Sequence, residues 1–99
     1  MAYKEIVWST LARNELNNAL EFYFLRNGSA TYSLKLLNEV EELTLLLSQN
    51  EFIGRLTRNK FTRVISMKYY VIFYEINHLN IEIVSFWDNR QEPDKRKVK

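Results

Sequence analysis

The segment from Tyr70 to Ile76 limits most tightly what this chain can fold into. Its residues are apolar at both alternating sets of positions until Glu75 interrupts the run. A strand that is apolar on both faces is typical of the interior of a sheet, because such residues need cover on both sides. The segment therefore predicts a central strand of a sheet.

Three further segments carry the β-branched and aromatic residues that favour strands. They are residues 3–8, 61–66 and 81–87. The last two lie on either side of the central segment, and short turns at residues 67–69 and 77–80 join them to it. Connections this short favour antiparallel pairing, so these strands are predicted to form a meander with the central one.

Two helices are predicted between the first strand and the second. Ser9 or Thr10 can cap the first helix, and Gly28 is expected to end it. One face of that helix carries apolar residues at helical spacing: Ala12, Leu16, Ala19, Leu20, Tyr23 and Phe24. The second helix is expected to begin near Ser29 or Thr31. Its apolar face is formed by Leu36, Val40, Leu43 and Leu47, with Leu37 and Leu46 beside it. Because the link between the helices is short, they are predicted to pack as an antiparallel hairpin.

The resulting order is β-α-α-β-β-β, with a loop around Gly54 at residues 52–60 between the second helix and the second strand. A chain of 99 residues can build one modest hydrophobic core and no second one. We therefore expect a single α+β domain over residues 1–99, in which the helical hairpin covers one face of an antiparallel sheet. The end of the chain, residues 94–99, is expected to fray.

Several kinds of site are excluded by residues that the chain lacks. It has no cysteine, which excludes disulfides, thiolate zinc sites and a cysteine nucleophile. Its only histidine is His78, so a site with several histidine ligands is impossible, and we expect neither a metal nor another cofactor. There is no run of about 18 apolar residues, so no membrane partner is expected. The N-terminus lacks the apolar core of a signal peptide, which favours a cytoplasmic protein.

Charge is distributed unevenly along the chain. Residues 1–54 hold four basic and seven acidic residues, whereas residues 55–99 hold ten basic and five acidic ones. No acid occurs between Phe52 and Tyr74, and the basic residues of this window are Arg55, Arg58, Lys60, Arg63 and Lys68. A basic face of this kind indicates an anionic partner, such as a nucleic acid, a nucleotide or an acidic protein. The alternative is that these side chains only solvate a sheet edge and the tail.

The order of elements and the end of the chain together resemble the RelE/ParE superfamily of bacterial toxins from type II toxin–antitoxin pairs. The matching features are residues 6–9 before an alanine-bearing helix, the basic strand with Arg63, the central strand at residues 70–74, and residues 81–93. In the last of these, an aromatic pair precedes a D-x-R-Q-x-P sequence, which is similar to ParE-like members known as plasmid stabilisation proteins. The resemblance implies the fold given above and a toxin that inhibits growth until an antitoxin binds it.

The resemblance implies two possible activities. RelE-like members cleave messenger RNA in the ribosomal A site, whereas ParE-like members poison DNA gyrase and need no chemistry of their own. In the RelE-like pattern an arginine follows the first tyrosine of the central strand, and a tyrosine follows the C-terminal arginine. Here Val71 follows Tyr70, and no tyrosine follows Arg90. RNA cleavage needs groups that transfer protons, and the remaining candidate base, His78, lies in a predicted turn. We therefore expect a toxin that acts by binding rather than an enzyme.

The binding hypothesis assigns the contact with an acidic target such as DNA gyrase to four basic residues: Arg58, Lys60, Arg63 and Arg90. An antitoxin is the second expected partner, because a sheet with helices on one side leaves its other face open. The residues expected to be only partly hidden on that face are Val71, Phe73, Val84 and Phe86. Two alternatives stay open: a ribosome-dependent mRNA endoribonuclease with the same fold, and an RNA- or protein-binding module without toxicity.

Overall fold

The computed structural model of the chain describes residues 4–89. Its elements, in chain order, are β1 (Glu5–Trp8), α1 (Thr10–Asn27), α2 (Thr31–Gln49), β2 (Arg55–Leu56), β3 (Thr62–Ser66), β4 (Tyr70–Ile76) and β5 (Asn80–Asp88). The predicted order is confirmed with one addition, because the loop expected at residues 52–60 contains the short strand β2. Two residues are too few to show a period, and only pairing with β3 makes them a strand. The expected fraying of residues 94–99 lies outside the described residues.

The strands form one five-stranded sheet in the order β1-β5-β4-β3-β2. β4 has a strand on each side, which confirms it as a central strand, and β2 to β5 pair with antiparallel neighbours. At one edge β1 pairs parallel to β5, with Ile6 opposite Ile81 and Trp8 opposite Ile83. The sheet is therefore mixed rather than wholly antiparallel. Two helices and three strands separate β1 from β5 in the chain, and a connection of that length permits parallel pairing.

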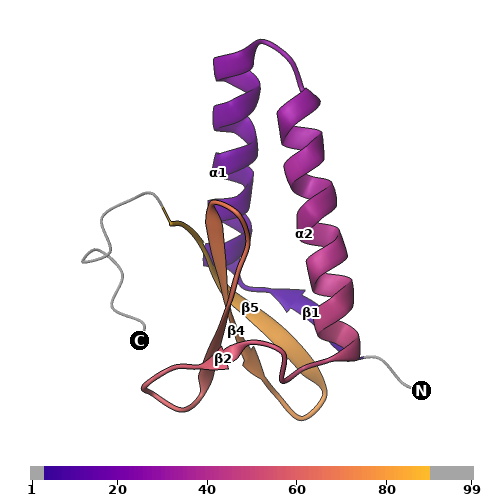
Figure 1. The fold of residues 1–99 in the computed structure, drawn as a ribbon, viewed down its shortest axis with the longest axis vertical. Helices are drawn as coiled ribbons and strands as arrows, with labels where there is room; N and C mark the ends of the chain where they lie inside the picture. The colour runs from indigo at the N-terminus through magenta and orange to yellow at the C-terminus, as the bar shows by residue number, and fades with distance from the viewer. Residues whose placement is uncertain (1–3, 90–99) are drawn as a thin grey trace.

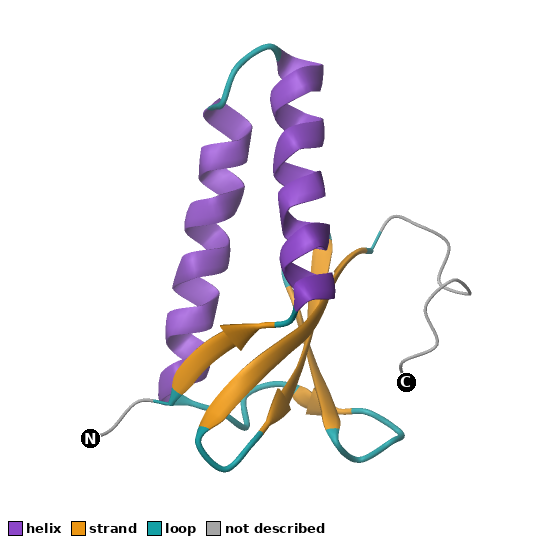
Figure 2. Ribbon diagram, turned by 180° about the vertical axis from the view of Figure 1, so that it is seen from behind, coloured by secondary structure: helices purple, strands orange, loops and turns teal. Residues whose placement is uncertain are grey.

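The two helices lie side by side and extend past the strands (Figure 1). From behind, the connection between them lies at the end farthest from the sheet (Figure 2). α1 follows Ser9 as its cap and ends at Gly28, whose φ of 68° is in the left-handed region that disfavours side chains. α2 begins at Thr31, the second of the two predicted starts. The far turns of the hairpin have no sheet to pack on, and the predicted burial of Phe24 is wrong because this side chain is exposed.

The hydrophobic core lies between the helical hairpin and one face of the sheet. Its fully buried strand residues are Ile72, Tyr74, Ile81 and Ile83. The helices add the predicted stripe residues Ala12, Leu16, Tyr23, Leu36, Val40 and Leu47. This packing confirms that the hairpin covers the sheet on one side.

A β-bulge in β5 changes which of its residues face the core. The register between β4 and β5 shifts after Phe73, and Val84 faces no residue of β4. The extra residue turns Phe86 to the core side, whereas simple alternation from Ile83 would leave it on the outer face. Phe86 is buried, and so are Val71 and Phe73, which have a strand on each side. The expectation that these three would be only partly hidden is therefore wrong, and only Val84 is half-buried.

The start of α1 binds backbone groups of β5 around the bulge. The hydroxyl of Ser9 accepts a hydrogen bond from the N–H of Ala12 at 3.0 Å and donates one to the carbonyl of Val84 at 3.2 Å. Further along α1, Oε1 of Glu15 accepts a hydrogen bond from the N–H of Phe86 at 2.9 Å. These bonds fix the first helix on the strand at the place where the ladder is irregular.

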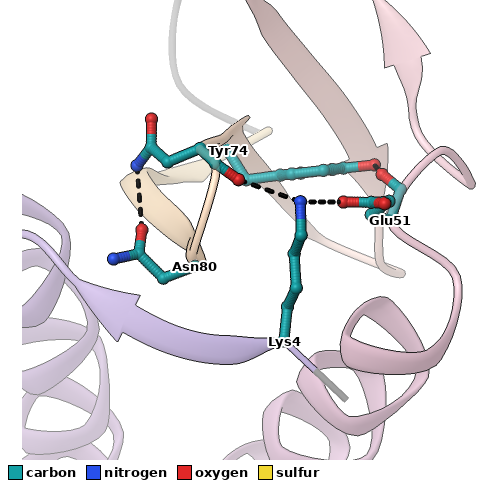
Figure 3. Close-up of polar contacts among 5 residues, drawn as sticks. Lys4, Glu51, Tyr74 and Asn80 are labelled. Carbon is teal, nitrogen blue, oxygen red and sulfur yellow. Dashed lines mark hydrogen bonds and ion pairs between the residues drawn. The ribbon is translucent and has the colours of Figure 1, made fainter. Parts of the chain in front are cut away.

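A buried tyrosine fixes the segment that leads from α2 to β2. The Tyr74 hydroxyl accepts a hydrogen bond from the N–H of Gly54 at 2.8 Å and donates one to the carbonyl of Glu51 at 2.9 Å. A Cβ at Gly54 would lie 2.7 Å from the Tyr74 ring, so this position requires glycine. Lys4 forms an ion pair with Glu51 beside Tyr74, with 2.6 Å between Nζ and Oε1 (Figure 3). Nη1 of Arg63 donates to the carbonyl of Gly54 at 2.7 Å, which completes the attachment.

The double role of Ser9 predicts a measurable loss of stability in Ser9→Ala. Two hydrogen bonds disappear, so we expect the free energy of unfolding in urea to fall by about 1–2 kcal/mol. The control is Ser48→Ala, which removes a hydroxyl that bonds only the carbonyl of Leu45 within α2. That change should stay within about 0.5 kcal/mol. Equal effects of the two substitutions would contradict the role given to Ser9.

Tyr74→Phe tests the attachment of the loop. It removes the hydroxyl and leaves the N–H of Gly54 and the carbonyl of Glu51 without this partner. We expect the free energy of unfolding to fall by about 1–3 kcal/mol, because buried polar groups without partners are costly. Urea unfolding measures the change. An unaltered midpoint would mean that these bonds do not hold the loop.

Alkaline pH provides a second test of the same residue. Burial raises the pKa of Tyr74 above its ordinary value of 10.0, and the hydrogen bond from Gly54 opposes the shift only in part. The unfolded chain therefore ionises this tyrosine first, so the contribution to stability is complete below a pH of about 10 and is lost as the pH rises further. In urea titrations, the advantage of the parent chain over Tyr74→Phe should be constant below that pH and shrink above it. An advantage that stays constant through the alkaline range would refute the assignment.

Candidate target-binding surface

The four residues predicted to bind a target do not share one environment. Arg58 and Lys60 are exposed in the turn between β2 and β3. Arg63 is half-buried within β3, where it lies opposite Tyr74. Arg90 lies outside the described residues. The structure therefore brings Arg58 and Lys60 together and gives Arg63 a separate position.

The described chain ends at the opposite end of the sheet from this turn. Thr62, the first residue of β3, pairs with Glu75 near the end of β4, whereas Asp88 pairs with Tyr70 at the start of β4. The five residue steps from Tyr70 to Glu75 along β4 correspond to roughly 17 Å. A role of Arg90 in the same contact as the turn stays a prediction.

Hydrogen bonds of Asn59 hold the turn between β2 and β3 in one conformation. Its Oδ1 accepts from the N–H groups of Phe61 and Thr62, both at 2.8 Å. The N–H of Thr57 donates to the carbonyl of Thr62 at 2.8 Å and closes the turn. Lys60 has a φ of 65°, in the region where glycine is the usual residue. A side chain there costs roughly 1–2 kcal/mol, so the turn carries a cation at a position that backbone energetics alone would give to glycine.

Apolar residues around the turn were missed by the sequence reasoning. Large apolar side chains with 43–77% of their surface exposed lie within residues 52–61, which we call the hairpin segment: Phe52, Ile53, Leu56 and Phe61. A signal was present, because a loop of solvated residues would not contain three large apolar side chains. Those three lie in the predicted loop at residues 52–60 and Phe61 begins the predicted strand at residues 61–66, so none of the four was expected at an exposed site. Exposed apolar area beside cations is typical of an interaction surface.

Arg63 contacts the hairpin segment at two residues, Phe52 and Gly54. Its guanidinium carbon lies 5.1 Å from the centre of the Phe52 ring, and its Nη1 binds the carbonyl of Gly54. A cation stacked on an aromatic ring is attracted to its face. Arg63 therefore positions Phe52 rather than extending freely into solvent.

The cations of the hairpin segment are not neutralised within residues 4–89. Arg55, Arg58 and Lys60 form no ion pair with any carboxylate of that part of the chain. The sequence between Phe52 and Tyr74 has no acid to offer. The positive potential of the segment is therefore available to an anionic partner.

Other site chemistry finds little support in the described part of the chain. His78 is exposed in the turn between β4 and β5. Residues 4–89 contain no group of three side chains placed to hold a metal ion. No helix within the same residues is both long enough and apolar enough to cross a bilayer.

Comparisons with known proteins agree with the fold. A family model described as the ParE toxin of the type II toxin–antitoxin system, parDE, matches residues 6–93. No curated protein matches the chain. A solved structure described as the chromosomal ParDE TA system from P. aeruginosa aligns with a TM-score of 0.72 at 17% identity, over 87% of this chain and 96% of that chain. At that identity the structural match shows the fold alone, and the family model carries the assignment. The chain belongs to the ParE toxin family of type II toxin–antitoxin systems.

Proposed function

We propose that this ParE-family toxin inhibits growth by binding DNA gyrase through the hairpin segment, without catalysing a reaction itself. The observation that carries the proposal is the pair of exposed cations Arg58 and Lys60, on a turn held by hydrogen bonds and without carboxylate partners in the described residues. Phe52 and Phe61 add exposed aromatic area beside them. Aromatic side chains and arginine dominate the binding energy of protein interfaces, and an acidic surface of the target complements the charge.

The central strand favours binding over RNA cleavage. The position at which the RelE-like pattern has an arginine is Val71, which is buried. Tyr70 beside it is buried too. A catalytic group must reach the proton that it transfers, and these two side chains are not presented to a substrate.

An antitoxin is the partner that membership of the parDE family implies. The outer face of the sheet offers an antitoxin little exposed apolar area at Val71 and Phe73, because both side chains are buried. The hairpin segment offers exposed apolar side chains together with cations. An antitoxin with acidic residues that covers this segment would block the contact with gyrase, and a gyrase target would place the site of action in the cytoplasm.

Reversal of the hairpin charges tests the proposal. The parent chain should inhibit supercoiling by purified gyrase, and the double variant Arg58→Glu/Lys60→Glu should need at least about tenfold more protein for the same inhibition. The matched control, Arg13→Glu/Lys35→Glu, reverses two exposed cations on α1 and α2 and should inhibit like the parent. Urea unfolding of all three chains establishes that they are equally folded.

Two results would overturn the proposal. One is full supercoiling at saturating parent protein together with codon-specific cleavage of ribosome-bound mRNA, which would favour the endoribonuclease reading. The other is equal inhibition by both double variants, which would place the gyrase contact outside the turn.

A further inference from the structure

An apolar groove with an acidic rim lies between α2 and the turn that joins β3 to β4. It has a volume of about 350 Å³. Leu43, Leu46 and Met67 supply its apolar lining. Glu39 and Glu42, one turn apart on α2, form one rim, and the turn provides Lys68 on the other side. The groove therefore suits an apolar side chain that is accompanied by positive charge.

The tip of the β2–β3 hairpin has the complementary chemistry. Phe61 is 77% exposed, and Lys60 precedes it directly. Arg58 lies in the same turn, and the bonds of Asn59 keep the tip in one conformation. A rigid aromatic side chain with adjacent cations can enter a groove at a low cost in conformational entropy.

Tip and groove cannot meet within one molecule. They lie at opposite ends of β3, because the tip precedes Thr62 and the groove is lined from Ser66 onward. The four residue steps between these positions span roughly 13 Å of rigid strand. Only a second molecule can bring a tip into the groove.

We propose that the free toxin self-associates head to tail, with Phe61 of one copy in the groove beside Glu39 and Glu42 of the next. Charge complementarity selects this occupant, because the cations of the tip meet the carboxylates of the rim. The contact is heterologous, so each added copy presents a new groove or a new tip, and oligomers larger than dimers form. Association also covers the hairpin segment, so it competes with any other partner of that segment.

Sedimentation velocity of the full chain alone, over a range of concentrations and at low and high salt, tests this inference. We expect concentration-dependent association that weakens at high salt, because the rim contacts are screened. Phe61→Ala should weaken association by about tenfold or more. The control is Leu79→Ala, since Leu79 is 78% exposed in the turn between β4 and β5 and should not affect association.

Charge reversal identifies which surfaces meet. Arg58→Glu and Glu42→Lys should each weaken association when measured alone, because like charges then face each other. An equimolar mixture of the two variants should associate again, since the acidic tip fits the basic groove and the native tip fits the native groove. Urea unfolding of each variant confirms that it is folded.

Three results would refute the inference: a monomer at every concentration at low salt, equal effects of Phe61→Ala and Leu79→Ala, or a mixture that does not regain association. The measurement contains no gyrase. Its failure would therefore leave the supercoiling result as it stands, and a failed supercoiling assay would not alter the sedimentation result.

Discussion

The two hydrogen bonds of the Tyr74 hydroxyl are the interaction on which the surface chemistry of this molecule depends. A fully buried hydroxyl needs partners, and here they are the backbone groups of Gly54 and Glu51. The bonds join the segment after α2 to the central strand of the sheet, and β2 begins at the next residue. Without them, the turn with Arg58 and Lys60 would be attached only through the strand β2, the hydrogen bond between Thr57 and Thr62 and the contacts of Arg63.

A second set of polar contacts joins the helices to the sheet. Around the bulge at Val84, the hydroxyl of Ser9 binds the carbonyl of Val84 and the carboxylate of Glu15 binds the N–H of Phe86. Burial of one face determines which alternating residues of a strand point to the core, and the bulge changes that alternation at Val84. These hydrogen bonds hold α1 against β5 at the bulge, where the side chain of Phe86 points to the core.

The candidate surface was predictable in its charge and unpredictable in its geometry. The absence of acids around Arg58 and Lys60 is a property of the sequence, so the sequence alone places these two cations on one acid-free segment. The sequence could not distinguish them from Arg63, because the role of a cation in a strand depends on which groups its side chain contacts. Arg63 contacts the ring of Phe52 and the carbonyl of Gly54, just before β2. Phe61 was missed because the sequence predicts it as the first residue of a strand, whereas β3 begins at Thr62 and leaves Phe61 exposed in the turn.

The sequence by itself determined the order of the helices and of the four predicted strands, the start of α1 at Ser9 or Thr10, its end at Gly28, and the central place of β4. These features depend on capping bonds between near neighbours and on the period of apolar residues, which a linear sequence displays. Only the tertiary structure decided the parallel pairing of β1 with β5, the existence of β2 and the bulge at Val84. The first joins segments that are far apart in the chain, whereas β2 and the bulge depend on backbone pairing with the next strand, which the period of apolar residues does not display.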